Sequence, residues 1–394
     1  MATKARRSFS QQNLEFRHSG ELGEQLAEAL RVPAHGGYVL THRFHPYPGR
    51  FHPHLPRRLL KDHEGTEIRV FDPFMGGGTA LVEAMLLGLP TEGNDLNPVA
   101  SLVARERTQP RSSEQAERIK GEAGRIAAQV EALRREKNPP RVRQRNLERL
   151  APHYQQHLLA ELLQWLRLVN ALPQIPARET LRAVFSSGVV KYSNRLSDSV
   201  GERDPPRYPK GAVTRFFVAK CDELLEAQVT LGRRLIAPAQ VRLHQEDSLL
   251  LPSLGWGLFD IIITSPPYPG TYDYYEQHRL RMDWLELESE SFQSGELGAR
   301  RETRQRRWSH GMKDVMTSLY RVLRPGGSLF LVLGDWVEGD HGVDAATALR
   351  RIAKAVGWRE GASASARRGT HSRKEQKAFS KKGKWEHLIE FRRP

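Results

Sequence analysis

The chain has 394 residues, of which 39% are hydrophobic and 27% charged, a balance typical of a globular protein with one large or two ordinary domains. No apolar run reaches the roughly 18 residues of a membrane span, and the basic N-terminus lacks the apolar core of a secretory signal, so we expect a cytoplasmic location without membrane association. The net charge of +15 favours a nucleic-acid partner over a basic surface kept only for solubility.

Short apolar runs alternate with helical patterns at both ends of the chain. Residues 68–71 (IRVF) predict a buried strand that runs into the glycines at 76–78, and residues 80–88 predict a helix. The runs 259–264 (FDIIIT) and 328–336 (SLFLVLGDW) predict two further strands that are covered on both faces. Strands separated by helices indicate a doubly wound, Rossmann-like α/β sheet.

The middle of the chain has a different pattern. Residues 101–240 are rich in Arg and Glu, with apolar positions at helical spacing. We interpret them as a mainly helical insertion into an α/β domain formed by residues 1–100 and 241–394. The single cysteine, Cys221, falls in one of these helices, where a small buried apolar role is expected; it excludes an intrachain disulfide and a cysteine-based zinc site.

A glycine-rich turn follows the first strand, in the sequence VFDPFMGGGTALVEA. Asp72 stands at the carboxyl edge of the strand, where open α/β sheets bind their ligands, and Gly76, Gly77 and Gly78 let the backbone turn sharply and approach a ligand. A phosphate loop is excluded because no Lys follows the glycines, and the spacing does not fit the dinucleotide fingerprint GxGxxG.

An acidic residue, Asp95 in EGNDLNP, lies 23 positions after Asp72 at the end of the next predicted strand. A carboxylate there can accept hydrogen bonds from both ribose hydroxyls of an adenosine. A helix N-cap is the alternative role for Asp95, and the glycine turn upstream makes it the less favoured one.

At this point the sequence resembles the amino-directed DNA methyltransferases. DPFMGGGT is similar to their motif for the methionine part of S-adenosylmethionine, GNDLNP to the acidic motif that follows, and residues 42–60 (HRFHPYPGRFHPHLPRRLL) to the segment that closes over the cofactor. The resemblance implies S-adenosylmethionine as cofactor, with the adenine amino group contacted by Asp247 of HQEDSLL. The binding residues implied are Phe51, Pro53, Asp72, Pro73, Phe74, Gly76, Gly78, Thr79, Asp95 and Asp247. Read alone, residues 42–60 could be an irregular proline-rich loop, and Asp247 an ordinary turn residue.

A second turn, Ser265-Pro266-Pro267-Tyr268, ends the strand 259–264. Because the two prolines have no N–H, the turn offers no local donor to its own carbonyls. These carbonyls and the Ser265 oxygen can therefore accept both hydrogens of an exocyclic amine. Its lone pair would then point at the methyl sulfonium for direct in-line transfer, for which no metal is needed. Tyr268 offers a face on which a base flipped out of duplex DNA can stack. A proline-stiffened surface turn is disfavoured because a buried strand leads into it.

The turn also resembles the catalytic motif of these enzymes, and this likeness indicates the target atom. A serine in its first position is more typical of cytosine-N4 enzymes, whereas Asp or Asn is more typical of adenine-N6 enzymes, so we predict cytosine N4. The chain does not resemble cytosine-C5 methyltransferases. Those enzymes carry a nucleophilic cysteine in a Pro-Cys turn near this point of the sequence, and Cys221 does not stand there.

The resembling motifs cover residues 38–98 and 245–336, so the insertion lies where a target-recognition region would be expected. Lys191, Asn194 and Arg195 of its polar loop are the candidate contacts to double-stranded DNA, with ordinary polar loop residues as the alternative. The basic stretches 298–308 and 372–384 would hold phosphates rather than read bases, or form solvated faces.

Three other functions stay open at this stage: adenine-N6 methylation of DNA, methylation of an RNA base, and a nonenzymatic DNA-binding subunit with a methyltransferase fold. No RNA-recognition signature is present, which disfavours the second, and intact motifs disfavour the third. A solitary enzyme and one paired with a restriction endonuclease both remain compatible with the sequence, as does any oligomeric state.

Overall fold

The computed structural model of the chain describes residues 15–33, 38–136, 142–196, 201–204, 206–269, 273–298, 305–370 and 372–394, with the backbone alone for 305–307. Its strands are β1 (Phe16–Ser19), β2 (Val70–Asp72), β3 (Thr91–Asn94), β4 (Val241–His244), β5 (Phe259–Thr264), β6 (Leu323–Gly334), β7 (Trp336–Glu338), β8 (His341–Val343), β9 (Arg359–Arg368) and β10 (Lys384–Arg392).

The helices are α1 (Gly23–Leu30), α2 (His54–Leu60), α3 (Thr79–Leu86), α4 (Pro98–Arg107), α5 (Ser113–Arg135), α6 (Leu147–Leu150), α7 (Gln156–Asn170), α8 (Ile175–Gly188), α9 (Ala212–Arg234), α10 (Tyr274–Leu285), α11 (Glu290–Gly295), α12 (Gln305–Val322), α13 (Ala345–Val356) and α14 (Arg373–Ala378). Short 3₁₀ helices occupy Leu40–Arg43, Lys61–His63 and Ala151–His153. None of the helices in the described ranges combines the length and the apolar character that crossing a bilayer requires.

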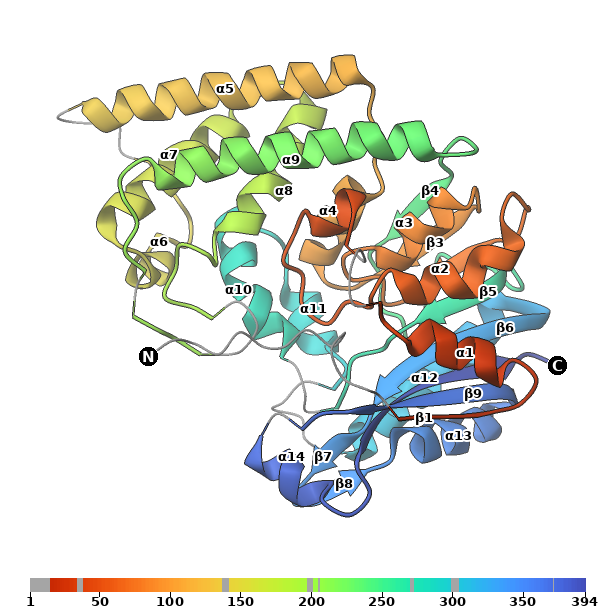
Figure 1. Ribbon diagram of the computed structural model, residues 1–394. Helices are drawn as coiled ribbons and strands as arrows, with labels where there is room; N and C mark the ends of the chain where they lie inside the picture. The colour runs from red at the N-terminus through yellow and green to blue at the C-terminus, as the bar shows by residue number, and fades with distance from the viewer. Residues whose placement is uncertain are drawn as a thin grey trace.

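Eight strands of the described chain form one sheet in the order β1-β9-β10-β6-β5-β2-β3-β4 (Figure 1), and β7 pairs with β8 in a separate hairpin. The strands from β6 to β4 pair in parallel, whereas β10 runs antiparallel to both β6 and β9. The prediction of a doubly wound, Rossmann-like α/β sheet is confirmed, with the antiparallel strand β10 inserted between β6 and β9.

The predicted strands are present, with some ends shifted. The strand predicted at 68–71 is β2, which begins at Val70, and the one predicted at 259–264 agrees with β5. The run 328–336 falls largely within β6, which begins five residues earlier at Leu323. Helix α3 covers most of the predicted segment 80–88.

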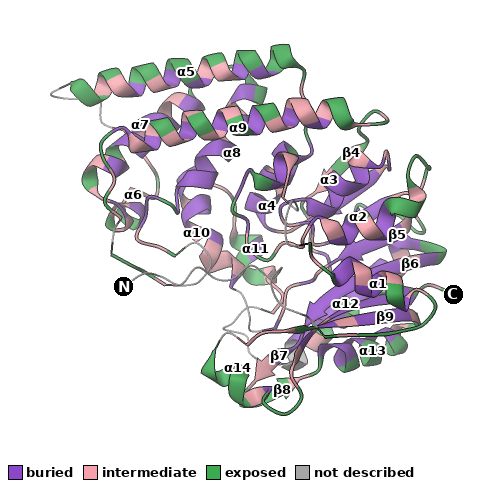
Figure 2. Cartoon of the chain, in the orientation of Figure 1, coloured by how far each residue is buried: buried purple, intermediate pink, exposed green. Residues whose placement is uncertain are grey.

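Alternate residues of the central strands face two helical layers. Leu329, Leu331 and Leu333 of β6 pack with α12 and α13, whereas Phe330 and Val332 pack with α1, α2 and α3. This alternation follows from the two-residue period of a strand, and it leaves the sheet buried between helices (Figure 2). Both faces being covered explains why β5 and β6 are continuous apolar runs in the sequence.

The helices between β3 and β4 surround a second apolar core. Residues of α5, α7, α8, α9 and α10 contribute to it, and α5 and α9 pack along each other (Figure 1). Cys221 of α9 lies in this core with no exposed surface, and burial raises the pKa of its thiol to about 12. The expected buried role of this cysteine is confirmed.

Candidate cofactor and substrate pocket

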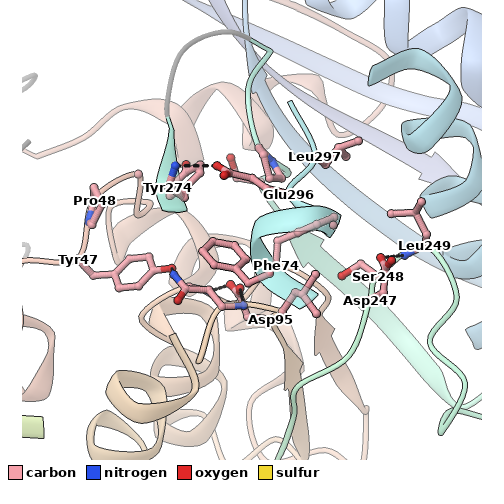
Figure 3. Close-up of a pocket in the computed structure, with 18 residues that line it drawn as sticks. Tyr47, Pro48, Phe74, Asp95, Asp247, Ser248, Leu249, Tyr274, Glu296 and Leu297 are labelled. Atoms are coloured by element: carbon pink, nitrogen blue, oxygen red, sulfur yellow. Dashed lines mark hydrogen bonds between the residues drawn. The ribbon is translucent and has the colours of Figure 1, made fainter. Parts of the chain in front are cut away.

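A pocket enclosing about 650 Å³, part of it open to solvent, lies at the carboxyl ends of four parallel strands. The lining residues after the strands are Phe74 and Gly76 (β2), residues 95–97 (β3), residues 247–249 (β4), and Ser265 and Pro267 (β5). The other walls are residues 47–49, Tyr274, Phe292 and residues 295–297. Figure 3 shows several of these side chains gathered around Phe74. The two motifs singled out in the sequence therefore open into one cavity.

The glycine turn is held to the end of β3 by the Asp95 carboxylate. Gly76 has a φ of +48° and Gly78 a φ of +76°, conformations that glycine adopts without strain, and Gly78 caps α3. The Gly76 N–H donates to Asp95 Oδ2 at 2.9 Å, and the Asn97 N–H donates to Oδ1 at 2.9 Å. Burial raises the pKa of Asp95 to about 6. Asp95 thus joins two strand ends and still faces the pocket.

Four residues of the predicted cofactor motif lie outside the pocket lining and support the turn instead. Asp72 is buried and accepts hydrogen bonds from Thr264 Oγ1 at 2.8 Å and from the Phe74 N–H at 3.1 Å. Burial raises the pKa of Asp72 to about 7. The remaining three are Pro73, whose carbonyl accepts from Ser248, Gly78, which packs on α4, and Thr79, which is buried at the start of α3.

The N-terminal segment forms a wall of the pocket, but through different residues from those predicted. Tyr47 lies in the lining, where its hydroxyl accepts a hydrogen bond from Asn97 Nδ2 at 3.0 Å and its ring lies 4.7 Å from that of His278. Phe51 packs against the core formed by α1, α2 and the sheet, and Pro53 precedes α2. The segment lines the pocket through residues 47–49 and not through Phe51 and Pro53, and its role in holding a cofactor stays a prediction.

The turn at Ser265-Pro266-Pro267-Tyr268 lies partly inside the pocket lining and partly outside it. Ser265 and Pro267 line the pocket, and Pro266 and Tyr268 do not. The Pro267 carbonyl accepts a hydrogen bond from the indole Nε1 of Trp308 at 3.1 Å, a donor that lies 41 residues later in the chain.

The Tyr268 ring lies against the end of β6. A Cβ added to Gly334 would be 3.0 Å from this ring, so the glycine makes room for it. The Tyr268 hydroxyl donates to Glu386 Oε1 at 3.4 Å and accepts from Ser265 Oγ at 3.5 Å. The ring therefore stands beside the pocket, anchored at its hydroxyl to β10.

A third carboxylate, Glu296, lines the pocket together with Asp95 and Asp247 (Figure 3). Its oxygens accept hydrogen bonds from the backbone N–H groups of Tyr274 at 2.6 Å and Tyr275 at 3.3 Å, at the start of α10. Burial raises the pKa of Glu296 to about 7. None of the described residues that line the pocket is Lys or Arg, so the site favours a cationic ligand.

The residues that sequence reasoning missed come mainly from two places. Residues 47–49 belong to the recognised segment, and their Tyr-Pro-Gly turn is a local signal that could have directed attention to them. Phe292 and Gly295 lie in the short helix α11, and residues 296–297 follow it. They carry no motif, because tertiary packing of α11 near the strand ends brings them to the pocket.

The three candidate DNA contacts all have partners within the chain. Lys191 Nζ lies 4.3 Å from the ring centroid of Phe216, and Asn194 Oδ1 is 2.8 Å from a histidine ring nitrogen. Arg195 lies 3.7 Å from Glu276 of α10. A contact of these residues with DNA stays a prediction.

The two basic stretches differ in how far they are described. Residues 299–304 of the stretch 298–308 lie outside the described residues. The stretch 372–384 contains α14, whose Glu375 is paired at 2.8 Å with Lys384, the first residue of β10. Their assignment to phosphate contacts stays a prediction as well.

One group of possible metal ligands occurs in the described chain: Asp335, Asp344 and His387, whose ligand atoms lie within 4.8 Å of one another. Hydrogen bonds within the chain already account for the grouping of these three side chains. Asp335 Oδ1 is 3.0 Å from His387 Nε2 and accepts from a backbone N–H, and Asp344 caps α13. The cluster ties β10 to the start of α13.

No family model matches the chain. Among curated proteins it is 26% identical to the Type II methyltransferase M.MvaI of Kocuria varians over 265 residues, covering 63% of this chain and 58% of that protein. It is 41% identical to the Type II methyltransferase M.MjaII of Methanocaldococcus jannaschii over 69 residues, 18% of this chain and 13% of that protein. The chain therefore spans less than two thirds of either relative.

Among solved structures, TrmN from Thermus thermophilus matches 87% of this chain and 49% of its own, at 13% identity and a TM-score of 0.34. A geranyl diphosphate C-methyltransferase from Streptomyces coelicolor A3(2) matches 86% of this chain and 75% of its own, at 9% identity and a TM-score of 0.34. By its sequence matches, the chain is a homologue of Type II methyltransferases.

Proposed function

We propose that the chain is an S-adenosylmethionine-dependent DNA methyltransferase that modifies the exocyclic amino group of a flipped base, preferably cytosine N4. The observation that carries the proposal is a single pocket in which Asp95 and the glycine turn meet Ser265 and Pro267. A cofactor site and an amine-binding turn placed together are what direct methyl transfer requires. The two Type II relatives and the net charge of +15 support DNA as the substrate.

The chemistry of the pocket fits the cofactor. Asp95 would accept hydrogen bonds from the ribose hydroxyls, and Asp247 would accept one from the adenine amino group. Glu296 adds a third carboxylate, and together these charges suit a ligand with an ammonium and a sulfonium group. When bound, the cofactor supplies a methyl group attached to an excellent leaving group.

The catalytic turn would hold the amine. Ser265 Oγ and the Pro267 carbonyl, both in the pocket lining, are the acceptors we assign to its two hydrogens. A carbonyl oxygen has two lone pairs, so that of Pro267 can accept from the amine as well as from Trp308. Holding both hydrogens orients the amine lone pair for in-line attack, and preorganised acceptors lower the barrier without a strong base. Tyr268 would stack on the flipped base, an interaction worth about 1–3 kcal/mol in single-strand binding.

The helical residues 101–240 are proposed to carry target recognition, with Lys191, Asn194 and Arg195 as candidate DNA contacts. Ser265 is the residue on which the preference for cytosine N4 over adenine N6 rests, because serine in the first position of the turn resembles the cytosine-N4 enzymes.

The reaction product tests the proposal. Purified protein is incubated with S-adenosylmethionine and genomic DNA from a host that lacks both marks, and the DNA is digested to nucleosides for mass spectrometry. We expect N4-methylcytosine. N6-methyladenine would keep the mechanism and overturn the inference from Ser265. If methylated nucleosides are found only in a parallel RNA sample, the substrate is RNA. Failure to bind S-adenosylmethionine would favour a nonenzymatic DNA-binding subunit.

The pocket carboxylates predict a pH dependence of cofactor binding. Burial raises the pKa of Asp95 to about 6 and that of Glu296 to about 7, and the Asp273 and Glu276 charges near Glu296 also raise its pKa. A bound cation favours the ionised carboxylates, so the complex holds fewer protons than the free protein. The affinity for S-adenosylmethionine is therefore highest above these pKa values, and it falls as the pH decreases through about 7 and then about 6.

Isothermal titration of S-adenosylmethionine between about pH 7.5 and pH 5.5 measures this dependence, in a range below the ordinary pKa of the ligand's α-amino group. S-adenosylhomocysteine, which lacks the sulfonium charge, is the control and should show a shallower dependence. Flat profiles for both ligands would contradict the pairing of these carboxylates with a cation.

A further inference from the structure

Two walls of the pocket come from distant parts of the sequence: the glycine turn after β2 and residues 47–49. Arg107, the last residue of α4, bridges the segments that carry them. Its Nη1 donates to the Gly77 carbonyl at 2.9 Å, and its Nη2 donates to the His45 carbonyl at 2.7 Å. One guanidinium therefore joins the glycine turn to the N-terminal segment two residues before Tyr47.

The environment of Arg107 fixes it in this place. The side chain has no exposed surface, and among the described residues no carboxylate forms an ion pair with it. A buried cation is costly unless it is well hydrogen-bonded, so the two carbonyl contacts are what hold the guanidinium where it lies. Thr41 Oγ1 donates in turn to the Arg107 carbonyl at 2.8 Å, which adds a second bond between α4 and the N-terminal segment.

The middle glycine of the turn, Gly77, leaves room for this guanidinium. Gly76 and Gly78 have positive φ angles, whereas Gly77 is absent from the positive-φ glycines of the described chain. A Cβ added to Gly77 would lie 2.3 Å from Arg107 Nη1 and 3.1 Å from its Cζ. The space that a side chain at position 77 would need is therefore occupied by the guanidinium.

We propose that Arg107 is a positioning residue that fixes the Tyr47 wall of the pocket against the glycine turn, and that position 77 is glycine in order to admit it. The inference rests on the proposed cofactor site for its effect on binding. The bridge that Arg107 forms between the two segments is a property of the folded chain, so it can also be tested without any ligand.

Four variants test the pair: Arg107→Met, Arg107→Lys, Gly77→Ala, and the double variant Arg107→Met with Gly77→Ala. Charged hydrogen bonds commonly contribute a factor of about ten each, so we expect Arg107→Met to weaken S-adenosylmethionine binding about tenfold or more. Lysine lacks the two-pronged fork, so Arg107→Lys should recover only part of the affinity. Gly77→Ala should resemble Arg107→Met, because the new methyl group displaces the guanidinium.

The double variant separates positioning from a general loss of packing. Once methionine replaces Arg107, an alanine at position 77 has no guanidinium to displace, so the double variant should bind no more weakly than Arg107→Met. Arg105→Met is the matched control, because Arg105 is exposed on the same helix, and it should behave as the wild type.

Amide hydrogen exchange of residues 41–50 in the ligand-free protein is the second measurement. We expect faster exchange in Arg107→Met and Gly77→Ala, and unchanged exchange in Arg105→Met. Unchanged exchange in Arg107→Met, or losses that add in the double variant, would overturn the proposal. If the wild type fails to bind S-adenosylmethionine, the proposed function fails, whereas the exchange experiment still decides whether Arg107 fixes the segment.

Discussion

Replacing Asp95 with alanine is expected to weaken S-adenosylmethionine binding by roughly 100-fold, or about 2.7 kcal/mol, because hydrogen bonds to a charged acceptor contribute about 1.5–3 kcal/mol each. The loss has two physical sources. The ribose hydroxyls lose their proposed acceptor, and the Gly76 N–H loses the carboxylate oxygen that it contacts at 2.9 Å, which loosens the glycine turn. Isothermal titration gives the affinity, and thermal melting checks that the variant folds.

Two comparisons separate these sources. Asp340→Ala removes the same charge from an exposed turn between β7 and β8 and should leave the affinity unchanged. S-adenosylhomocysteine and its 2′,3′-dideoxy form are then titrated against the wild type and Asp95→Ala. If Asp95 holds the ribose, the wild type discriminates between the two ligands and the variant does not. A variant that still discriminates would assign the ribose to another residue and leave Asp95 as a support of the turn.

The fold and half of the site follow from local sequence. The apolar runs of β5 and β6 indicate strands covered on both faces, and the positive-φ glycines Gly76 and Gly78 mark the turn that follows β2. Asp95 is found because the end of one strand lies beside the end of the next in a parallel sheet. These inferences need only the period of a strand and the spacing between strands.

The rest depends on contacts between distant segments, which a single sequence does not reveal. Gly77 looks like part of a ligand-binding turn, but its lack of a side chain reflects Arg107, thirty residues later. Asp72 looks like a ligand residue because of its motif, yet Thr264 and burial keep it out of the pocket lining. Glu296 has no motif; it directly follows α11, and the start of α10 binds its carboxylate at the pocket.

Tyr268 is the residue for which a separation of binding from chemistry is expected. It lies outside the lining of the pocket that contains Asp95 and Asp247, so Tyr268→Ala should leave S-adenosylmethionine affinity nearly unchanged. Methyl transfer should fall roughly 10- to 100-fold, since stacking of an aromatic ring on a base is worth about 1–3 kcal/mol. Single-turnover methylation and isothermal titration measure the two quantities on the same preparation.

Tyr268→Phe is the matched variant, because it keeps the ring and removes the hydroxyl that contacts Glu386 at 3.4 Å and Ser265 at 3.5 Å. If the ring acts by stacking, Tyr268→Phe should retain most of the methylation that Tyr268→Ala loses. If the hydroxyl acts by holding Ser265, methylation should fall by a similar factor in Tyr268→Phe and Tyr268→Ala. Equal losses of cofactor affinity and of methylation in Tyr268→Ala would instead mean that the ring supports the pocket as a whole, and the flipped base would need another stacking partner.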